Sequence, residues 1–211
     1  LNNNVISSAM VGTIDSEGVM KGAIANRYRG QASMRIKEKY AKTTEETYIE
    51  NMEDESEFTV DNYSISGMDT TCVAEQFSYE KKLAVAGDLI YLNATGLTFM
   101  YKSVFTAQER MLPVEYSYPE SYTISCSFKI PEGYVVEEKP DNISLTALNG
   151  SLRMTYLSEQ VNETINVRLT YTMSQIIFPA EMYADLKTFM DRVVAQSNSQ
   201  IVLKKVGSAQ D

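Results

Sequence analysis

Long segments of this sequence alternate strictly between apolar and polar residues, and no other feature restricts the fold as much. In residues 73–83 and 122–130, every second side chain shares one mostly apolar face. A period of two is the repeat of a β-strand that buries one face and leaves the other in water. The shared faces carry Val73, Glu75, Phe77, Tyr79, Lys81 and Leu83 in the first segment, and Tyr122, Ile124, Cys126, Phe128 and Ile130 in the second. The chain is therefore expected to be mainly β.

Turn residues divide the rest of the β pattern. Asp15-Ser16-Glu17-Gly18 interrupts residues 4–29, and Asn149-Gly150 interrupts residues 143–160. Both turns end in glycine, which hairpin turns favour because it accepts a positive φ. The sequence therefore predicts two hairpins, together with a bulged strand over residues 57–66. The irregular apolar residues 96–108 are expected to form a loop that packs on a sheet.

Two segments change to a helical period. Residues 31–53 predict one or two short helices, and Thr43 with Glu46 fits a capping box. Residues 180–197 predict an amphipathic helix that covers its own sheet or, as the alternative, binds a partner. Its apolar stripe consists of Met182, Tyr183, Leu186, Phe189, Met190, Val193 and Val194. A last strand is expected in residues 200–205.

Charge and hydropathy exclude two classes of partner. The 211 residues include 19 basic and 28 acidic side chains, a net charge of −9, and both halves of the chain are acidic. A nucleic-acid-binding face needs clustered basic residues, so no nucleic-acid partner is expected. No apolar run approaches the roughly 20 residues of a membrane-spanning helix, so no membrane span is expected.

The sequence contains no histidine, and this limits its chemistry. Histidine is the usual general base near neutral pH and the commonest metal ligand. Ser-His-Asp and Cys-His mechanisms and histidine zinc sites cannot be assembled, and two cysteines are too few for an all-cysteine zinc site. We expect no catalytic residue, metal or cofactor, although carboxylate and serine-lysine chemistry stay open.

The two cysteines, Cys72 and Cys126, lie in strand-like segments of different halves. Unpaired cysteine behaves as a small buried hydrophobic residue, so two free, packed thiols are expected. A disulfide would require export and adjacent strands. A reactive thiol would need a basic neighbour, which the local sequence does not provide.

A structural joint is predicted where the strand pattern restarts. Glu109 and Arg110 follow the irregular apolar residues, and Pro113 stiffens the backbone before the next strand. We interpret Glu109, Arg110 and Pro113 as an interdomain contact, since no second catalytic group accompanies the pair. The predicted fold is mainly β (α+β), with two β-sandwich-like domains. Residues 1–110 carry one or two short helices, and residues 111–211 carry the C-terminal helix, packed on its sheet, and the final strand.

The same region resembles a known family. The relevant motifs are Glu109-Arg110, Pro113-Val114, Tyr116, Tyr118, Ile130-Pro131-Glu132-Gly133-Tyr134, residues 137–140, the segment FPAEMYADLKTFMDRVV and the ending QIVLKK. Together they resemble the C-terminal β-rich domains, of unknown function, of bacterial envelope proteins with a transglutaminase-like core. The resemblance is best over residues 109–205 and weaker over residues 1–108.

The resemblance implies a function for the chain. The family's catalytic Cys, His and Asp would lie upstream of Leu1, so this chain would be a non-catalytic accessory module in the periplasm or cell envelope of a Gram-negative bacterium. Its partner would be the transglutaminase-like domain of the same polypeptide, a hydrolase or protease. Because Leu1 is not a starting methionine, a fragment or processed product is expected.

Two other functions remain open at this point. An independent carbohydrate- or peptide-binding module would use exposed tyrosines, of which Tyr79, Tyr122, Tyr156 and Tyr171 lie in the strands. The lack of tryptophan weakens this alternative. A carboxylate-based hydrolase would need two acids about 5–10 Å apart in a cleft, and the sequence identifies no such pair.

Overall fold

The computed structural model describes residues 3–95, 103 and 105–206, and it confirms a mainly β fold with three helices. An eight-stranded mixed sheet has the order β10-β11-β12-β8-β1-β2-β4-β3. A four-stranded sheet, β5-β6-β14-β9, and a two-stranded sheet, β13-β7, complete the β structure of the described residues. The predicted loop at 96–108 lies mostly outside these residues.

The first part of the chain forms one half of the large sheet. Its elements are β1 (Asn4–Ile14), β2 (Val19–Gly30), α1 (Gln31–Ala41), α2 (Glu45–Ser56), β3 (Thr59–Ser66) and β4 (Cys72–Lys82). The predicted hairpin is confirmed, since the Asp15 and Gly18 amides close the turn between β1 and β2. The predicted bulge is also confirmed, because the β3–β4 register shifts between Asp61 and Ser64.

One detail of the helix prediction was wrong. Thr44, not Thr43, caps α2, because its Oγ1 accepts a hydrogen bond of 3.2 Å from the Thr47 amide. The Thr43 amide instead donates to the Tyr40 carbonyl in the turn that follows α1. A capping threonine is therefore present, but α2 begins one residue later than the predicted capping box indicates.

The second part supplies the other half of the large sheet and all the strands of the two smaller sheets. Its strands and helix are β5 (Ala84–Ala86), β6 (Leu89–Leu92), β7 (Val114–Glu115), β8 (Glu120–Lys129), β9 (Tyr134–Glu138), β10 (Ile143–Ala147), β11 (Leu152–Val161), β12 (Thr164–Met173), β13 (Ile177–Phe178), α3 (Tyr183–Ser197) and β14 (Ile201–Lys205). Short 3₁₀ turns at Leu148–Gly150 and Ala180–Met182 precede β11 and α3. The predicted Asn149-Gly150 hairpin, C-terminal helix and last strand are confirmed.

A parallel pair joins the two halves at the centre of the large sheet. Strand β1 pairs in parallel with β8, from Asn4 opposite Glu120 to Thr13 opposite Lys129. The other neighbouring strands in this sheet are antiparallel. The division into domains at residues 110 and 111 stays a prediction, but strands from both sides of that boundary share this sheet.

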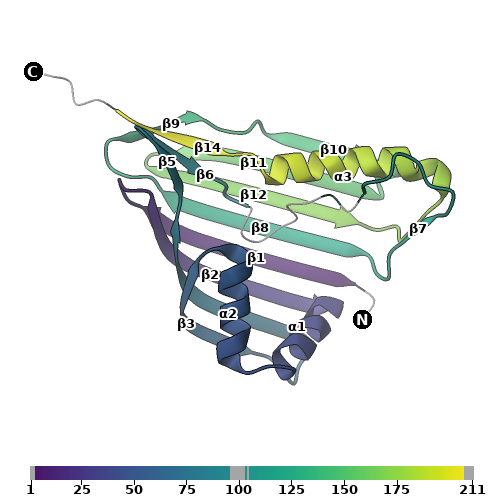
Figure 1. Cartoon of the computed structure of the whole chain (residues 1–211). Coiled ribbons are helices and arrows are strands. Elements are labelled where there is room, and N and C mark those ends of the chain that lie inside the picture. The colour runs from purple at the N-terminus through teal and green to yellow at the C-terminus, as the bar shows by residue number, and fades with distance from the viewer. Residues whose placement is uncertain (1–2, 96–102, 104, 207–211) are drawn as a thin grey trace, which may run out of the picture.

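Among the described residues, the helices and the four-stranded sheet cover only one face of the large sheet. Helices α1 and α2 lie over the β1-β2-β4-β3 end, while α3 and the four-stranded sheet lie over the other end (Figure 1). The covered face carries core side chains such as Phe77, Phe128 and Tyr171, which are at most 4% exposed. The opposite face presents small and polar residues, such as Ala9, Ser125 and Arg168, in one cross-strand line.

Candidate functional site: a polar cavity above the central strands

Three polar side chains interrupt the apolar covered face at the centre of β1, β2 and β4. Ser8 on β1 pairs with Asn26 on β2, which in turn pairs with Glu75 on β4, so all three lie side by side across the sheet. The Ser8 hydroxyl donates to Asn26 Oδ1 over 2.6 Å. Ser8 is 5% exposed and Glu75 is 1% exposed. We call these three residues the polar row.

Three tyrosines surround the carboxylate of the polar row. The Tyr48 hydroxyl, from α2, donates to Glu75 Oε1 over 2.6 Å, and the Tyr63 hydroxyl, from β3, donates to the same oxygen over 2.9 Å. Tyr28 on β2 is close enough for the Glu75 carboxylate to raise its pKa. Burial, and then the negative charge of Glu75, raise the pKa of each tyrosine well above its ordinary value. The phenols therefore stay protonated and available as donors.

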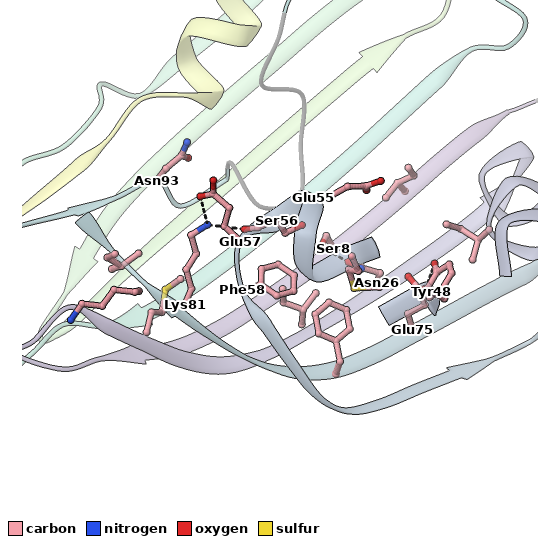
Figure 2. A pocket seen from close by; sticks show the side chains of 18 of the residues that line it. Ser8, Asn26, Tyr48, Glu55, Ser56, Glu57, Phe58, Glu75, Lys81 and Asn93 are labelled. Carbon is pink, nitrogen blue, oxygen red and sulfur yellow. Dashed lines mark hydrogen bonds and ion pairs between the residues drawn. The ribbon is translucent and has the colours of Figure 1, made fainter. Parts of the chain in front are cut away.

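The polar row, Tyr28 and Tyr48 line a cavity of about 820 Å³ between α2 and β6. Figure 2 shows Tyr48 and Glu75 pointing toward each other, with Ser8 and Asn26 beside them. Apolar side chains form much of the remaining wall: Ile6, Met20, Ile24, Met52, Phe58, Phe77 and Leu83. A mixed wall of this kind suits a small molecule or a side chain that has one polar end.

The basic residues that line the cavity have partners away from Glu75. Lys39 Nζ lies 3.7 Å from Glu55 Oε1 and 5.6 Å from the centre of the Tyr48 ring. Lys81 Nζ donates to the Ser56 carbonyl over 2.8 Å, and burial lowers the pKa of Lys81. Lys82 donates to the Glu17 carbonyl. No lysine or arginine within residues 3–95, 103 and 105–206 forms an ion pair with Glu75.

The cavity does not combine two buried acids. Of the described acidic residues that line it, only Glu75 is buried, while the Glu55 and Glu57 side chains are 69% and 88% exposed. In the described part of the chain no group of three or more His, Cys, Asp or Glu could hold a metal ion. No helix there is long and apolar enough to span a membrane.

Both cysteines are free thiols. Cys126 on β8 is 4% exposed, and its Sγ donates to the Ala94 carbonyl over 3.1 Å. Burial raises the pKa of the Cys126 thiol to about 12. Because the thiolate is the nucleophilic form, Cys126 is held in its unreactive state at neutral pH.

The buried thiol predicts a pH dependence of stability. Its pKa in the folded protein, about 12, exceeds the ordinary value of 9.0. The folded state therefore keeps a proton that the unfolded state loses. The stability from this difference is complete below pH 9 and falls by about 1.4 kcal/mol per pH unit as the pH rises toward 12. Urea unfolding at a series of pH values measures the slope.

Cysteine variants isolate this contribution. The buried tyrosines, whose pKa values are also raised, add to the loss as the pH approaches 10, so the contribution of Cys126 is taken from the difference between wild type and variant at pH 9 to 10. Cys126→Ala is expected to flatten the fall there, although its stability at pH 7 is lower. Cys72→Ala leaves the Cys126 thiol in place and is expected to keep the wild-type slope. A Cys126→Ala protein with the wild-type slope would contradict the prediction.

The predicted interdomain residues lie elsewhere, near the start of α3. Glu109, Arg110 and Pro113 are exposed, and Glu109 and Arg110 line a small depression with Tyr183. The Arg110 guanidinium carbon lies 5.8 Å from the centre of the Tyr183 ring. A cation–π contact thus connects Arg110 to the C-terminal helix. That these residues form an interdomain contact stays a prediction.

The strand tyrosines do not form an exposed aromatic platform. Tyr79, Tyr156 and Tyr171 are at most 3% exposed, and Tyr122 is half-buried. Their rings pack within the protein; those of Tyr122 and Tyr171, for example, lie 5.9 Å apart. A sugar therefore has no stacking surface on these four residues.

The sequence contained one signal for the polar cavity. Alternation places Glu75 on the mostly buried face of its strand, and a charged residue there requires a partner. The groups around Glu75 could not be identified, because Ser8, Asn26 and Tyr48 come from three other elements. The sequence shows which face a side chain occupies, but not which strand or helix lies next to it.

Comparisons with known proteins identify a family. Residues 88–203, more than half of the chain, match the family described as Domain of Unknown Function with solved-structure structure (DUF3858). This confirms the expected domain of unknown function, while the transglutaminase-like neighbour stays a prediction. No curated protein matches the sequence.

The chain is also similar to a crystal structure of a putative protease from Parabacteroides distasonis ATCC 8503. The two chains are 11% identical, with a TM-score of 0.46. The similarity covers 55% of this chain and 23% of that one. This chain thus matches less than a quarter of the length of that protease.

Proposed function

Since this chain belongs to the DUF3858 family, whose function is unknown, we propose that it is a non-catalytic accessory module of a longer transglutaminase-like protein. The module stabilises or orients a cysteine-hydrolase-type core, or adds a recognition surface to it. The parent protein is a hydrolase or protease of the periplasm or cell envelope. Support for this partner comes from the sequence motifs of residues 109–205.

One observation supports the non-catalytic role above all others: the buried nucleophile has no base. The chain has no histidine, and the Cys126 thiol lies in the core with its pKa raised to about 12. A cysteine hydrolase requires a thiolate that a neighbouring base activates. The cavity does not provide the two acids of a carboxylate-based hydrolase either, because only one of the described acids that line it is buried. In this proposal the catalytic groups come from another part of the polypeptide.

Removal of the module from the parent protein tests the proposal. Deletion of residues 1–211 is expected to lower the melting temperature of the core by several degrees, or to lower its rate on peptide substrates by about tenfold. Either effect corresponds to a free-energy change of at least about 1 kcal/mol. Calorimetry and initial rates measure the two effects. A core with unchanged stability, solubility and activity would contradict the proposal, as would peptide hydrolysis by the isolated 211-residue chain.

A second candidate function is an independent peptide-binding module. The cavity beside Glu75 favours it, because it combines hydrogen-bonding groups with an apolar wall. A carbohydrate ligand receives less support, since the strand tyrosines are packed inside. An array of peptides and glycans distinguishes the two ligand classes, and a chain that retains nothing on either array would remove this candidate.

A further inference from the structure

We propose that the polar cavity binds a primary ammonium group attached to an apolar chain, with the Glu75 carboxylate as its counter-ion. The inference goes beyond the accessory function and does not depend on it, because it concerns only residues of this chain. It rests on the burial of Glu75, on the hydrogen-bond acceptors beside it, and on the apolar wall that faces them.

Glu75 is buried without a cationic partner. The residue is 1% exposed, and within the described ranges it is contacted by tyrosine hydroxyls rather than by lysine or arginine. An ionised carboxylate removed from water is costly unless a cation compensates it. Two phenols supply two of the about four hydrogen bonds that a carboxylate can accept. A ligand cation would supply the missing charge and further donors.

The neighbouring groups match the donors of an ammonium ion. A primary ammonium has three N–H donors and no acceptor. Asn26 Oδ1 and the Ser8 hydroxyl oxygen lie next to Glu75 in the polar row and can accept from them. The Tyr48 ring already holds the Lys39 ammonium at 5.6 Å, so the aromatic surface here is compatible with cations. An anionic ligand group at this position would face the Glu75 charge and be repelled.

The rest of the cavity suits an alkyl chain. Met20, Ile24 and Phe77 continue the covered face beyond the polar row, and Met52 and Phe58 face them from α2 and the turn after it. The volume of about 820 Å³ is within the range of small-molecule sites. The net charge of −9 also favours cationic over anionic ligands at long range. Either a peptide amino terminus or a lysine-like side chain provides this chemistry.

Three probes of equal length test the proposal by calorimetric titration. Hexylammonium is expected to bind at least about tenfold more tightly than hexan-1-ol, and hexanoate is expected not to bind. Glu75→Gln should remove this advantage, because the amide keeps the shape but not the charge. Glu80→Gln is the matched control: Glu80 is an exposed acid of the same strand that pairs with Lys21, and hexylammonium affinity should be unchanged.

A second measurement uses the wild-type chain and so does not depend on the folding of a variant. In methyl NMR spectra of the wild-type chain, hexylammonium should shift the resonances of Met20 and Met52, which line the cavity. The methyl resonance of Met111, whose side chain is 94% exposed, should stay in place. Equal affinity for hexylammonium and hexan-1-ol, or no saturable shift at Met20 and Met52, would overturn the proposal.

Two further ligands identify the source of the ammonium group. One is a dipeptide amide with a free amino terminus, and the other is Nα-acetyl-lysine methylamide. Tighter binding of the first indicates recognition of a peptide amino terminus, and tighter binding of the second indicates recognition of a lysine side chain. Failure of both, together with failure of hexylammonium, would overturn the inference but leave the accessory function untouched.

Discussion

Replacement of Gly22 by alanine is expected to lower the free energy of unfolding by about 3 kcal/mol or more. Gly22 on β2 lies opposite Gly12 on β1, in the central hairpin. A Cβ atom at Gly22 would lie 1.8 Å from the Val11 carbonyl oxygen and 2.7 Å from Gly12 Cα. Both are backbone atoms, so the strands would have to separate. Urea denaturation with circular dichroism measures the change.

A second glycine serves as the matched control. No atom lies within 4 Å of a Cβ built on Gly87, although its φ of 59° is in the left-handed region. Gly87→Ala is therefore expected to cost only about 1 kcal/mol, the penalty for that backbone conformation. If both variants lose the same stability, close strand packing at Gly22 is not the cause. The comparison separates crowding from backbone preference.

Phe128→Ala is expected to destabilise the protein by about 3–5 kcal/mol. Phe128 is fully buried on β8, and its neighbours in register are Gly12 and Ile165. The truncation leaves a cavity between the large sheet and its covering layer. The midpoint of urea unfolding measures the loss, and an unchanged m-value shows that the fold is retained.

A leucine on the other face of the same sheet tests whether the loss of stability depends on which face the side chain occupies. Leu157 on β11 is 46% exposed and points to the uncovered face. Leu157→Ala is expected to change stability by less than about 1 kcal/mol. A loss as large as that of Phe128→Ala would show that a second layer covers this face in solution.

The sequence predicted local structure well because alternation and turn residues act over short distances. The period of two located β4 and β8, and Asp15–Gly18 located the first hairpin. The change of period located α3. The exact start of α2 was wrong by one residue, since Thr43 and Thr44 are both suitable caps and only the preceding turn decides between them.

Long-range pairing could not be predicted in the same way. Nothing in the residues of β1 or β8 specifies that these strands pair in parallel, because their alternation defines faces and not neighbours. The polar cavity depends on this arrangement and on α2, which brings Tyr48 over Glu75. The sequence therefore placed Glu75 on the correct face but could not assemble the site around it.

The central parallel pair also affects how the protein is made on the ribosome. Asn4 contacts Glu120, 116 residues further along the chain. At typical rates of synthesis, about ten seconds pass before the β8 segment exists. During this time one edge of the β1–β2 hairpin has no strand to pair with, and such an edge invites association with other chains. A nascent chain of this kind should therefore benefit from chaperones that shield β1 until translation reaches β8.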